Sequence, residues 1–344
     1  MHTVMQPATS IETATPTAMG IADARAPHQV SRPPYPVSWQ ARAFNMALMV
    51  SVKPLLGLAP VNSVSLRVLD RAYGVAGLVL QRLPSFVQVS ATHFGQFDGE
   101  WLRAGAGLNE DKVMLYLHGG GYCFSSAQAH RPLTWRLSRM AKRPVLAINY
   151  RQGPDHDFEH WRDDALHAYQ HLLEKGYAPE NILIGGDSAG GHLTLTTLQH
   201  IRDSGLPLPR AAMCFSPWTD LSCEGASYQR NRFRDPMFAA GAVQGLSRYF
   251  ARARDPYHPL ISPLHGDFTG LPPIMITAGS TEVLRDDARR VAQRAHEHGV
   301  DVHYEEWRGM PHVFQLFAFW LPEARAAYRH MAKFVHGVEK DIAA

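Results

Sequence analysis

One serine lies in a setting that favours nucleophilic chemistry. Ser188 is the centre of the sequence GDSAG, residues 186–190, which follows the apolar run 182–184 and precedes a helical pattern that begins at Ala189. A serine on a tight turn between a strand and a helix takes strained backbone angles and projects its Oγ above the sheet. Ser188 is therefore a candidate nucleophile. The alternative is a glycine-rich turn in which Ser188 only caps the helix.

A triple glycine after another apolar run suggests an oxyanion hole. The sequence HGGG occupies residues 118–121, directly after the run 113–117. Acyl transfer builds negative charge on a carbonyl oxygen, and each fixed N–H donor at that point contributes about 2.7 to 4 kcal/mol. We assign the N–H groups of Gly120, Gly121 and Ala189 to this role. A phosphate-binding loop fits less well, because neither a Lys-Ser/Thr pair nor the GxGxxG spacing accompanies the glycines.

A serine hydroxyl needs a base, and the base needs a partner that orients it. His312 lies just after the last apolar run, in a loop that can bring an imidazole to the serine. The loop after the preceding run contains Glu282, Asp286 and Asp287. We choose Glu282 as the acid, because Asp286 and Asp287 suit the N-terminus of the next helix. Asp286 is the alternative.

The elements that must position these residues form an alternating pattern. The segment from Val87 to Trp101 predicts an antiparallel hairpin, and short apolar runs separated by helical patterns follow it. This order predicts an α/β fold with a mainly parallel sheet and helices on both faces. The segment 217–273 is longer than one crossover needs and predicts an inserted helix above the strand ends. The predicted strands are 113–117, 145–148, 182–184, 211–215, 274–277 and 302–307, and the predicted helices are 134–140, 159–174, 189–203, 286–298 and 322–339.

The N-terminal part of the chain has a different composition. Residues 1–36 are rich in Ala, Thr, Pro and Ser with little apolar periodicity, which predicts a mobile tail. Residues 37–85 carry apolar side chains at helical spacing, which predicts two or three helices outside the sheet. The catalytic domain is expected over 86–344.

Composition restricts the partners and the compartment. Of 344 residues, 34 are Lys or Arg and 31 are Asp or Glu, and the basic residues are scattered, so a nucleic-acid partner is not expected. The apolar stretch 43–60 is interrupted by polar residues and proline and is too short for a transmembrane segment. Resting against a membrane and covering the pocket are the two alternatives for this stretch. Three cysteines form no disulfide framework, and the start of the chain lacks the pattern of a secretory signal. We expect a cytoplasmic protein.

Together these segments resemble the hormone-sensitive-lipase-like family of α/β-hydrolases, which are serine esterases whose bacterial members include lactone hydrolases. The resemblance covers about 87–338. Glu282, where many members have Asp, and Val313, where many have Gly, look like the branch that resembles monoterpene lactone hydrolases. Besides HGGG and GDSAG, the matching segments are NYR at 149–151, SPWTD at 216–220, SPL at 262–264, LPP at 271–273 and the loop around His312.

The resemblance implies an α/β-hydrolase fold in which 37–85 forms a helical cap over the site. It implies Ser188 as the nucleophile, His312 as the base and Glu282 as the acid, with the oxyanion hole as assigned above. It also implies a homodimer. Neither a cofactor nor a metal is expected, because the proposed chemistry requires none.

Five side chains adjoin these loops and are candidates for an apolar substrate pocket, although aromatic residues beside a sheet are more often core. The expected function is hydrolysis of small to medium apolar acyl esters, or of lactones, through an acyl-serine intermediate. A ligand-binding protein on the same fold and an acyltransferase with the same triad are the alternatives. The pocket candidates are Tyr122, Phe124, Trp218, Met310 and Phe314.

Overall fold

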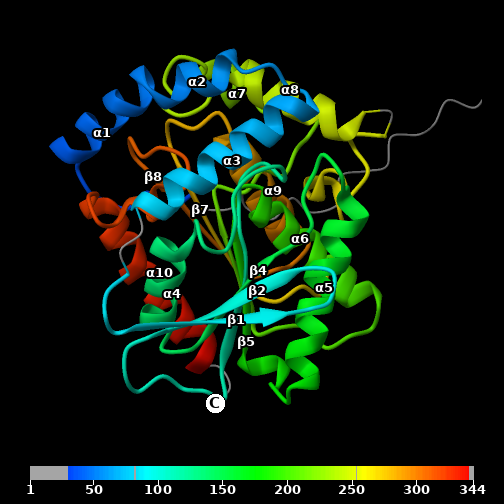
Figure 1. Ribbon diagram of the computed structural model, residues 1–344. Coiled ribbons are helices and arrows are strands. Elements are labelled where there is room, and N and C mark those ends of the chain that lie inside the picture. Colours follow the sequence, from blue (N-terminus) through cyan, green and yellow to red (C-terminus); the bar gives the residue numbers. More distant parts are fainter. Residues whose placement is uncertain (1–29, 81–82, 253, 341–344) are drawn as a thin grey trace, which may run out of the picture.

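The chain folds around an eight-stranded sheet (Figure 1). A computed structural model describes residues 30–80, 83–252 and 254–340. The strand order is β1-β2-β4-β3-β5-β6-β7-β8; β2 pairs antiparallel with β1 and β4, and all other neighbours are parallel. The strands are β1 (Val87–His93), β2 (Asp98–Ala104), β3 (Val113–Leu117), β4 (Val145–Asn149), β5 (Ile182–Asp187), β6 (Ala211–Phe215), β7 (Ile274–Gly279) and β8 (Val302–Trp307).

Helices cover both faces of this sheet (Figure 1). The strands β3, β5, β6 and β7 consist only of buried residues, as expected where parallel strands have helices on both sides. Apolar side chains form one core on each face. On one face lie α4 (Arg131–Ala141) and α10 (Pro322–Lys340), and on the other α5 (Phe158–Glu174), α6 (Ala189–Asp203) and α9 (Arg285–Glu297). Short 3-10 turns are η1 (Pro179–Asn181), η2 (Pro263–His265) and η3 (Phe314–Phe317).

A further group of helices lies over the carboxyl ends of the parallel strands. The side-chain amide of Asn45 in α1 donates to the carbonyl oxygen of Gly309 after β8 at 2.8 Å, which fixes α1 at this end of the sheet. No helix within the described ranges is both long and apolar enough to cross a membrane. The group contains α1 (Trp39–Val50), α2 (Val52–Leu58), α3 (Ser63–Leu80), α7 (Ser227–Arg230) and α8 (Ala240–Ala251), all at the top of Figure 1.

The start of α1 is anchored to α10. The Ser38 hydroxyl oxygen accepts the N–H of Ala41 at 3.1 Å, which caps the helix, and donates its own proton to Glu323 at 3.0 Å. The ring of Phe44 lies 4.5 Å from that of Phe317. Helix α1 therefore packs on the catalytic region rather than standing away from it.

The predicted α/β fold with helices on both faces is confirmed, and so is the N-terminal hairpin. The helix predicted within 217–273 is present as α8. Strand β5 continues past its predicted end to Asp187, because Gly185 and Gly186 still pair with residues of β6 although they add no apolar side chain. Apolar runs thus locate strands but underestimate their length where glycines follow.

Most of the tail predicted over 1–36 lies outside the described residues. The prediction is wrong for residues 30–36, which pack along β8. The backbone of Ser31 exchanges hydrogen bonds with β8, and the ring of Tyr35 stacks on Trp307 with centroids 5.5 Å apart. As an edge strand, β8 has unpaired backbone groups, and these offer partners to a segment of any composition.

Candidate active site

Loops from separate parts of the chain meet at the carboxyl edge of the sheet. The glycines of HGGG follow β3, Ser188 follows β5, Glu282 follows β7 and His312 follows β8. Parallel strands end at one edge, so residues far apart in sequence come together there. This edge of the sheet holds the candidate site.

The backbone of Ser188 is strained and held on both sides. Its dihedral angles are φ 54° and ψ −119°, a region that non-glycine residues rarely occupy. The N–H of Ser188 donates to the carbonyl of Phe215 at 2.8 Å, and its own carbonyl accepts the N–H of Trp218 at 3.1 Å. A Cβ atom at Gly190 would overlap the carbonyl of Leu117. Small neighbours and the adjacent strand therefore permit and fix this turn.

The HGGG loop presents backbone donors beside the serine. Gly120 and Gly121 have φ values of +113° and +58°, and a Cβ atom on Gly120 would overlap the carbonyl of Phe124. None of the residues that the structure describes accepts a hydrogen bond from the N–H of Gly120, Gly121 or Ala189. Ala189 is the first residue of α6, whose dipole is positive at that end. These three N–H groups can stabilise an oxyanion.

The residue before the nucleophile holds the HGGG loop in place. The carboxylate of Asp187 accepts the Tyr116 hydroxyl at 2.6 Å, the N–H of Gly119 at 3.0 Å and the Nε2 of His130 at 3.1 Å. Burial opposes the charge of Asp187, but the neighbouring His130 and these hydrogen bonds outweigh it and lower its pKa. Burial also opposes the charge of His130, and Asp187 outweighs it and raises the pKa of the ring. The two form a buried ion pair.

His118 is a second buried ring in this loop. Its Nδ1 donates to the carbonyl of Gly119 at 2.7 Å, its ring stacks on Tyr150 at 4.6 Å, and its own carbonyl accepts the Tyr150 hydroxyl at 2.8 Å. Burial, followed by the charge of His130, lowers the pKa of His118 to about 3. The ring is therefore neutral and fixes the loop.

Glu282 and His312 form the acid–base pair of the site. His312 Nδ1 lies 2.8 Å from Glu282 Oε2, and both side chains are buried. Glu282 Oε1 accepts the hydroxyl of Ser216 at 2.8 Å and the N–H of Gly279. The ring thus points Nδ1 at the acid and leaves Nε2 for other contacts. Among the described contacts none joins the Ser188 hydroxyl to His312.

Ser216 connects three of the loops. Its hydroxyl binds Glu282, its N–H donates to the carbonyl of Thr277 at 2.7 Å, and its Oγ accepts the N–H of Val313 at 3.2 Å. Val313 has φ 46°, a conformation that favours glycine and is strained for a β-branched residue. Ser216 therefore holds the residue after the candidate base as well as the acid itself.

The inserted segment supports the acid loop, which the sequence did not reveal. The amide of Asn231 donates to the carbonyl of Glu282 at 2.7 Å, and the carboxylate of Asp235 accepts the N–H of Val283 at 2.7 Å. Burial, the largest cause, raises the pKa of Asp235 to about 6. The ring of Phe238 lies 4.8 Å from that of His312. No motif in this segment predicts these contacts.

Leu246 of α8 is a further neighbour of the site that the sequence did not identify. A Cβ atom built on Gly121 would lie 2.7 Å from Leu246 Cδ2 and 3.8 Å from Phe124 Cε1. The side chain of Leu246 therefore lies against one of the proposed oxyanion donors, with Phe124 in ordinary contact beside it.

The alternative acids are engaged elsewhere. Asp286 accepts the N–H of Ser227 at 2.9 Å. Asp287 accepts the N–H groups of Thr219 at 3.1 Å and Asp220 at 3.0 Å, and burial raises its pKa. Neither carboxylate contacts His312 among the described contacts, so the geometry favours Glu282.

Four of the five pocket candidates are core residues. Tyr122 is fully buried and stacks on Trp161 with ring centroids 3.8 Å apart, and Trp218 is buried in the same core. Met310 and Phe314 are buried in the core on the opposite face. The structure thus packs these four side chains in the core, and their role in substrate binding stays a prediction. Phe124 alone is half-buried beside the HGGG loop.

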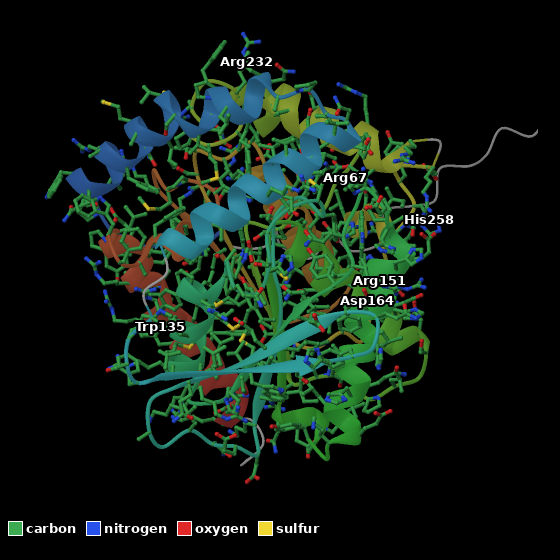
Figure 2. All side chains as sticks on the ribbon, viewed as in Figure 1. Arg67, Trp135, Arg151, Asp164, Arg232 and His258 are labelled. Carbon is green, nitrogen blue, oxygen red and sulfur yellow. The ribbon has the colours of Figure 1, made fainter. Side chains whose placement is uncertain are left out.

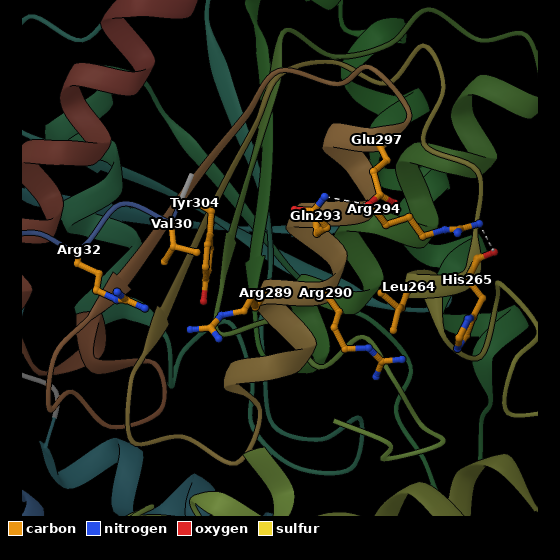
Figure 3. A pocket seen from close by; sticks show the side chains of 10 residues that line it. All are labelled: Val30, Arg32, Leu264, His265, Arg289, Arg290, Gln293, Arg294, Glu297 and Tyr304. Carbon is orange, nitrogen blue, oxygen red and sulfur yellow. Dashed lines mark hydrogen bonds between the residues drawn. The ribbon is translucent and has the colours of Figure 1, made fainter. Parts of the chain in front are cut away.

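A cavity of about 570 Å³ lies away from these loops, against α9 and β8 (Figure 3). Three of its arginines already have partners in the protein. Arg289 binds Glu306 at 2.5 Å, Arg290 binds Asp220, and Arg294 donates to a backbone carbonyl. None of the candidate catalytic residues lines this cavity.

Comparison with known proteins places this geometry among ester hydrolases. A family model described as the alpha/beta hydrolase fold matches residues 114–316. An acetyl-hydrolase of Streptomyces hygroscopicus is 43% identical over 241 residues, which cover 70% of this chain and 80% of the relative. An esterase of Acinetobacter venetianus is 31% identical over 256 residues, 74% of this chain and 84% of the relative. A crystal structure of an esterase from the bacterial hormone-sensitive lipase family superposes with a TM-score of 0.79 at 34% identity, covering 88% of this chain and 98% of that one.

Proposed function

We propose that Ser188, His312 and Glu282 are the catalytic triad of this chain. The premise is that the chain belongs to the alpha/beta hydrolase family and resembles its bacterial hormone-sensitive-lipase esterases. The chain is a serine hydrolase of carboxylic esters. The observation that carries the residue assignment is the 2.8 Å hydrogen bond between the buried His312 and Glu282, at the edge where Ser188 is strained.

In the first half of the reaction, the Ser188 oxygen attacks the ester carbonyl while His312 Nε2 takes the hydroxyl proton. Glu282 holds Nδ1 and stabilises the imidazolium that forms. The carbonyl oxygen becomes negative and accepts hydrogen bonds from Gly120, Gly121 and Ala189. The C–O bond to the alcohol then breaks, and His312 returns its proton to the leaving oxygen. The product is an acyl-serine.

In the second half, water replaces the alcohol. His312 Nε2 takes a proton from the water as its oxygen attacks the acyl carbonyl, and the same three N–H groups hold the oxyanion. Collapse of this intermediate breaks the bond to Ser188, and the imidazolium protonates the serine oxygen. The acid leaves and the enzyme returns to its starting state.

Short acyl groups suit this site best. Leu246 leaves no room for a Cβ atom at Gly121, so the space beside the oxyanion donors is narrow on that side. The relative named acetyl-hydrolase supports the same preference. Leu246→Ala is expected to favour longer acyl chains. For p-nitrophenyl esters, the ratio of kcat/KM for long chains to kcat/KM for acetate is expected to rise about tenfold. An unchanged preference would place the acyl group elsewhere.

Three finer features belong to the same proposal. Lactones are substrates, since a lactone is a cyclic ester and Glu282 and Val313 match the branch that resembles lactone hydrolases. The protein is cytoplasmic, which its three free cysteines support. It forms a homodimer, as the family resemblance implies. A lactone panel, cell fractionation and light scattering, respectively, test these points.

The decisive experiment compares wild-type protein with Ser188→Ala on p-nitrophenyl esters of increasing acyl length. Removing the nucleophile is expected to lower kcat by about 10⁴-fold or more. An equal denaturant midpoint for both proteins controls for folding. Near wild-type turnover by Ser188→Ala would refute the acyl-serine mechanism.

A further inference from the structure

The outer surface of the first helices exposes many large apolar side chains. Of the thirteen that are exposed in the described part of the chain, eight lie between Trp39 and Val68. Val50 is 74% exposed and Leu58 is 84% exposed. We name this surface the α1–α3 face; its apolar residues are Trp39, Met46, Met49, Val50, Leu55, Leu58, Val64 and Val68.

Such a concentration of apolar surface indicates a partner. Burying large apolar side chains stabilises a protein or a complex, and extended apolar patches are uncommon on surfaces that face only water. Trp39 also meets the half-exposed Trp320 edge-on at 5.8 Å, which extends the face. Tryptophan is enriched at the boundary between lipid and water.

The charges around this face are mainly positive. Residues 37–69 contain Arg42, Lys53 and Arg67 but no Asp or Glu, and Arg67 pairs with Asp155 at 2.7 Å. Lys53 donates to the carbonyls of Arg232 at 2.9 Å and Asp235 at 2.7 Å, which joins a second basic segment to α2.

That second segment, residues 230–234, has the sequence RNRFR. Its three arginines are exposed, and none forms an ion pair with a residue that the structure describes. Phe233 is 74% exposed, with the Arg232 guanidinium 4.4 Å from its ring centroid. Figure 2 shows Arg232 at the outer limit of the molecule, beyond α2.

We propose that the α1–α3 face and the segment 230–234 dock on an anionic lipid surface. Exposed aliphatic side chains would enter the boundary between headgroups and acyl chains, and the arginines would meet lipid phosphates. A second copy of the chain fits less well, because a symmetric contact would bring two basic surfaces together. Helices that lie on a membrane in this way do not cross it.

The docking face lies at the end of the molecule that holds the active site. Asn45 of α1 contacts the carbonyl of Gly309, three residues before His312, and Phe238 follows the basic segment and packs on His312. A docked enzyme would therefore take esters of lipophilic alcohols from the lipid phase. This substrate class rests on the proposed function, whereas docking itself does not.

Vesicle sedimentation of the full chain tests the docking. The probe is vesicles of phosphatidylcholine with or without phosphatidylserine. Wild type is expected to sediment with the anionic vesicles, and Leu55→Glu/Leu58→Glu to bind them at least tenfold more weakly. The matched control is Gln88→Glu/Ser90→Glu, which adds the same charge on exposed positions of β1 at the opposite end (Figure 1) and is expected to bind as wild type.

The basic segment gives a second test. Arg230→Ser/Arg232→Ser is expected to weaken binding to anionic vesicles by about twentyfold, and added salt to weaken wild type in the same way. No sedimentation of wild type with either vesicle overturns the proposal. So does a loss of dimer mass in Leu55→Glu/Leu58→Glu, which would make the face a contact between copies.

Activity measurements separate this proposal from the proposed function. Leu55→Glu/Leu58→Glu is expected to hydrolyse a water-soluble p-nitrophenyl ester at the wild-type rate but an ester dissolved in anionic vesicles about tenfold more slowly. Ser188→Ala is expected to bind vesicles normally. Vesicle binding without any ester turnover by wild type would refute the proposed function alone.

Discussion

Two buried carboxylate–histidine pairs lie among the loops around Ser188, and they differ in their second hydrogen bond. In the first, His312 uses Nδ1 for Glu282 at 2.8 Å, and no described residue binds its other nitrogen. In the second, His130 uses Nε2 for Asp187 at 3.1 Å, while its Nδ1 lies 3.1 Å from the carbonyl oxygen of Ser126 and 3.2 Å from the Ser125 hydroxyl, which can donate or accept.

The second nitrogen determines what each pair can do. A charged ring can donate from both nitrogens, here to Asp187 and to the carbonyl of Ser126, and cannot accept another proton. The raised pKa of His130 agrees with this state. A ring with one nitrogen left over can take a proton and return it. A carboxylate and a histidine thus make a proton carrier at His312 and a fixed ion pair at His130.

The largest expected effect is on the catalytic pair. Replacing Glu282 by Gln removes the charge that stabilises the imidazolium and favours the wrong tautomer of His312. We expect kcat to fall by about 10³ to 10⁴-fold while KM changes little. Steady-state kinetics with p-nitrophenyl acetate measures both.

The control for this variant is Asp286→Asn, because Asp286 is the alternative acid. Its carboxylate binds Ser227 rather than His312, so its loss is expected to change kcat by less than about tenfold. If Asp286→Asn lost activity and Glu282→Gln kept it, the two carboxylates would exchange roles and the comparison between the pairs would fail.

The second effect is on stability. Asp187→Asn leaves the buried His130 without its counter-charge, and breaking such a pair costs about 3 to 5 kcal/mol. Urea unfolding at neutral pH measures the loss. Because the folded-state pKa of His130 is raised, its protonation stabilises the folded protein fully at pH values below the unfolded pKa of about 6.5. This stabilisation is lost as the pH rises through the folded-state pKa. The difference between wild type and Asp187→Asn should therefore shrink at alkaline pH. A constant difference would argue against an ion pair.

The third effect is acid destabilisation by buried neutral rings. Burial lowers the pKa of His118 to about 3 and that of His192 to about 4. Between about pH 6.5 and 4 the unfolded chain binds protons at both positions and the folded chain does not, so stability falls as pH falls. Each ring is expected to contribute about 1.4 kcal/mol per pH unit.

Urea midpoints across this range check the slope. His192→Gln should remove about half of it, since Gln does not titrate. An unchanged slope in this variant would mean that His192 is charged in the folded protein.

The chemistry of the site could be predicted from sequence because it depends on short motifs and strand ends. GDSAG requires a tight turn after β5, and the triple glycine requires positive φ after β3, as found at Gly120. The rule that loops after parallel strands share one edge then brings Glu282 and His312 to the same place.

The support of the site could not be predicted in this way. Asn231 and Asp235 hold the acid loop through backbone atoms, and such contacts leave no pattern in a sequence. The burial of the pocket candidates could not be predicted for a related reason. Tyr122 adjoins the HGGG loop, but its positive φ of 63° turns the ring into the core beside Trp161. Side-chain direction depends on tertiary packing, which adjacency does not specify.

The smallest expected effect concerns the link between the acid and the loop of the base. Ser216→Ala removes one donor to Glu282 and the acceptor for the N–H of Val313, whose strained backbone then has one restraint fewer. Because Glu282 keeps the N–H of Gly279, we expect kcat to fall by only about tenfold, with KM unchanged.

The matched control is Ser280→Ala, which removes an acceptor for the N–H of Gly309 in the same loop but touches neither Glu282 nor Val313. Kinetics of both variants should show the larger loss in Ser216→Ala. Equal losses would mean that Ser216 only stabilises the loop. The hydrogen bond between His312 Nδ1 and Glu282 would then be enough to align Nε2.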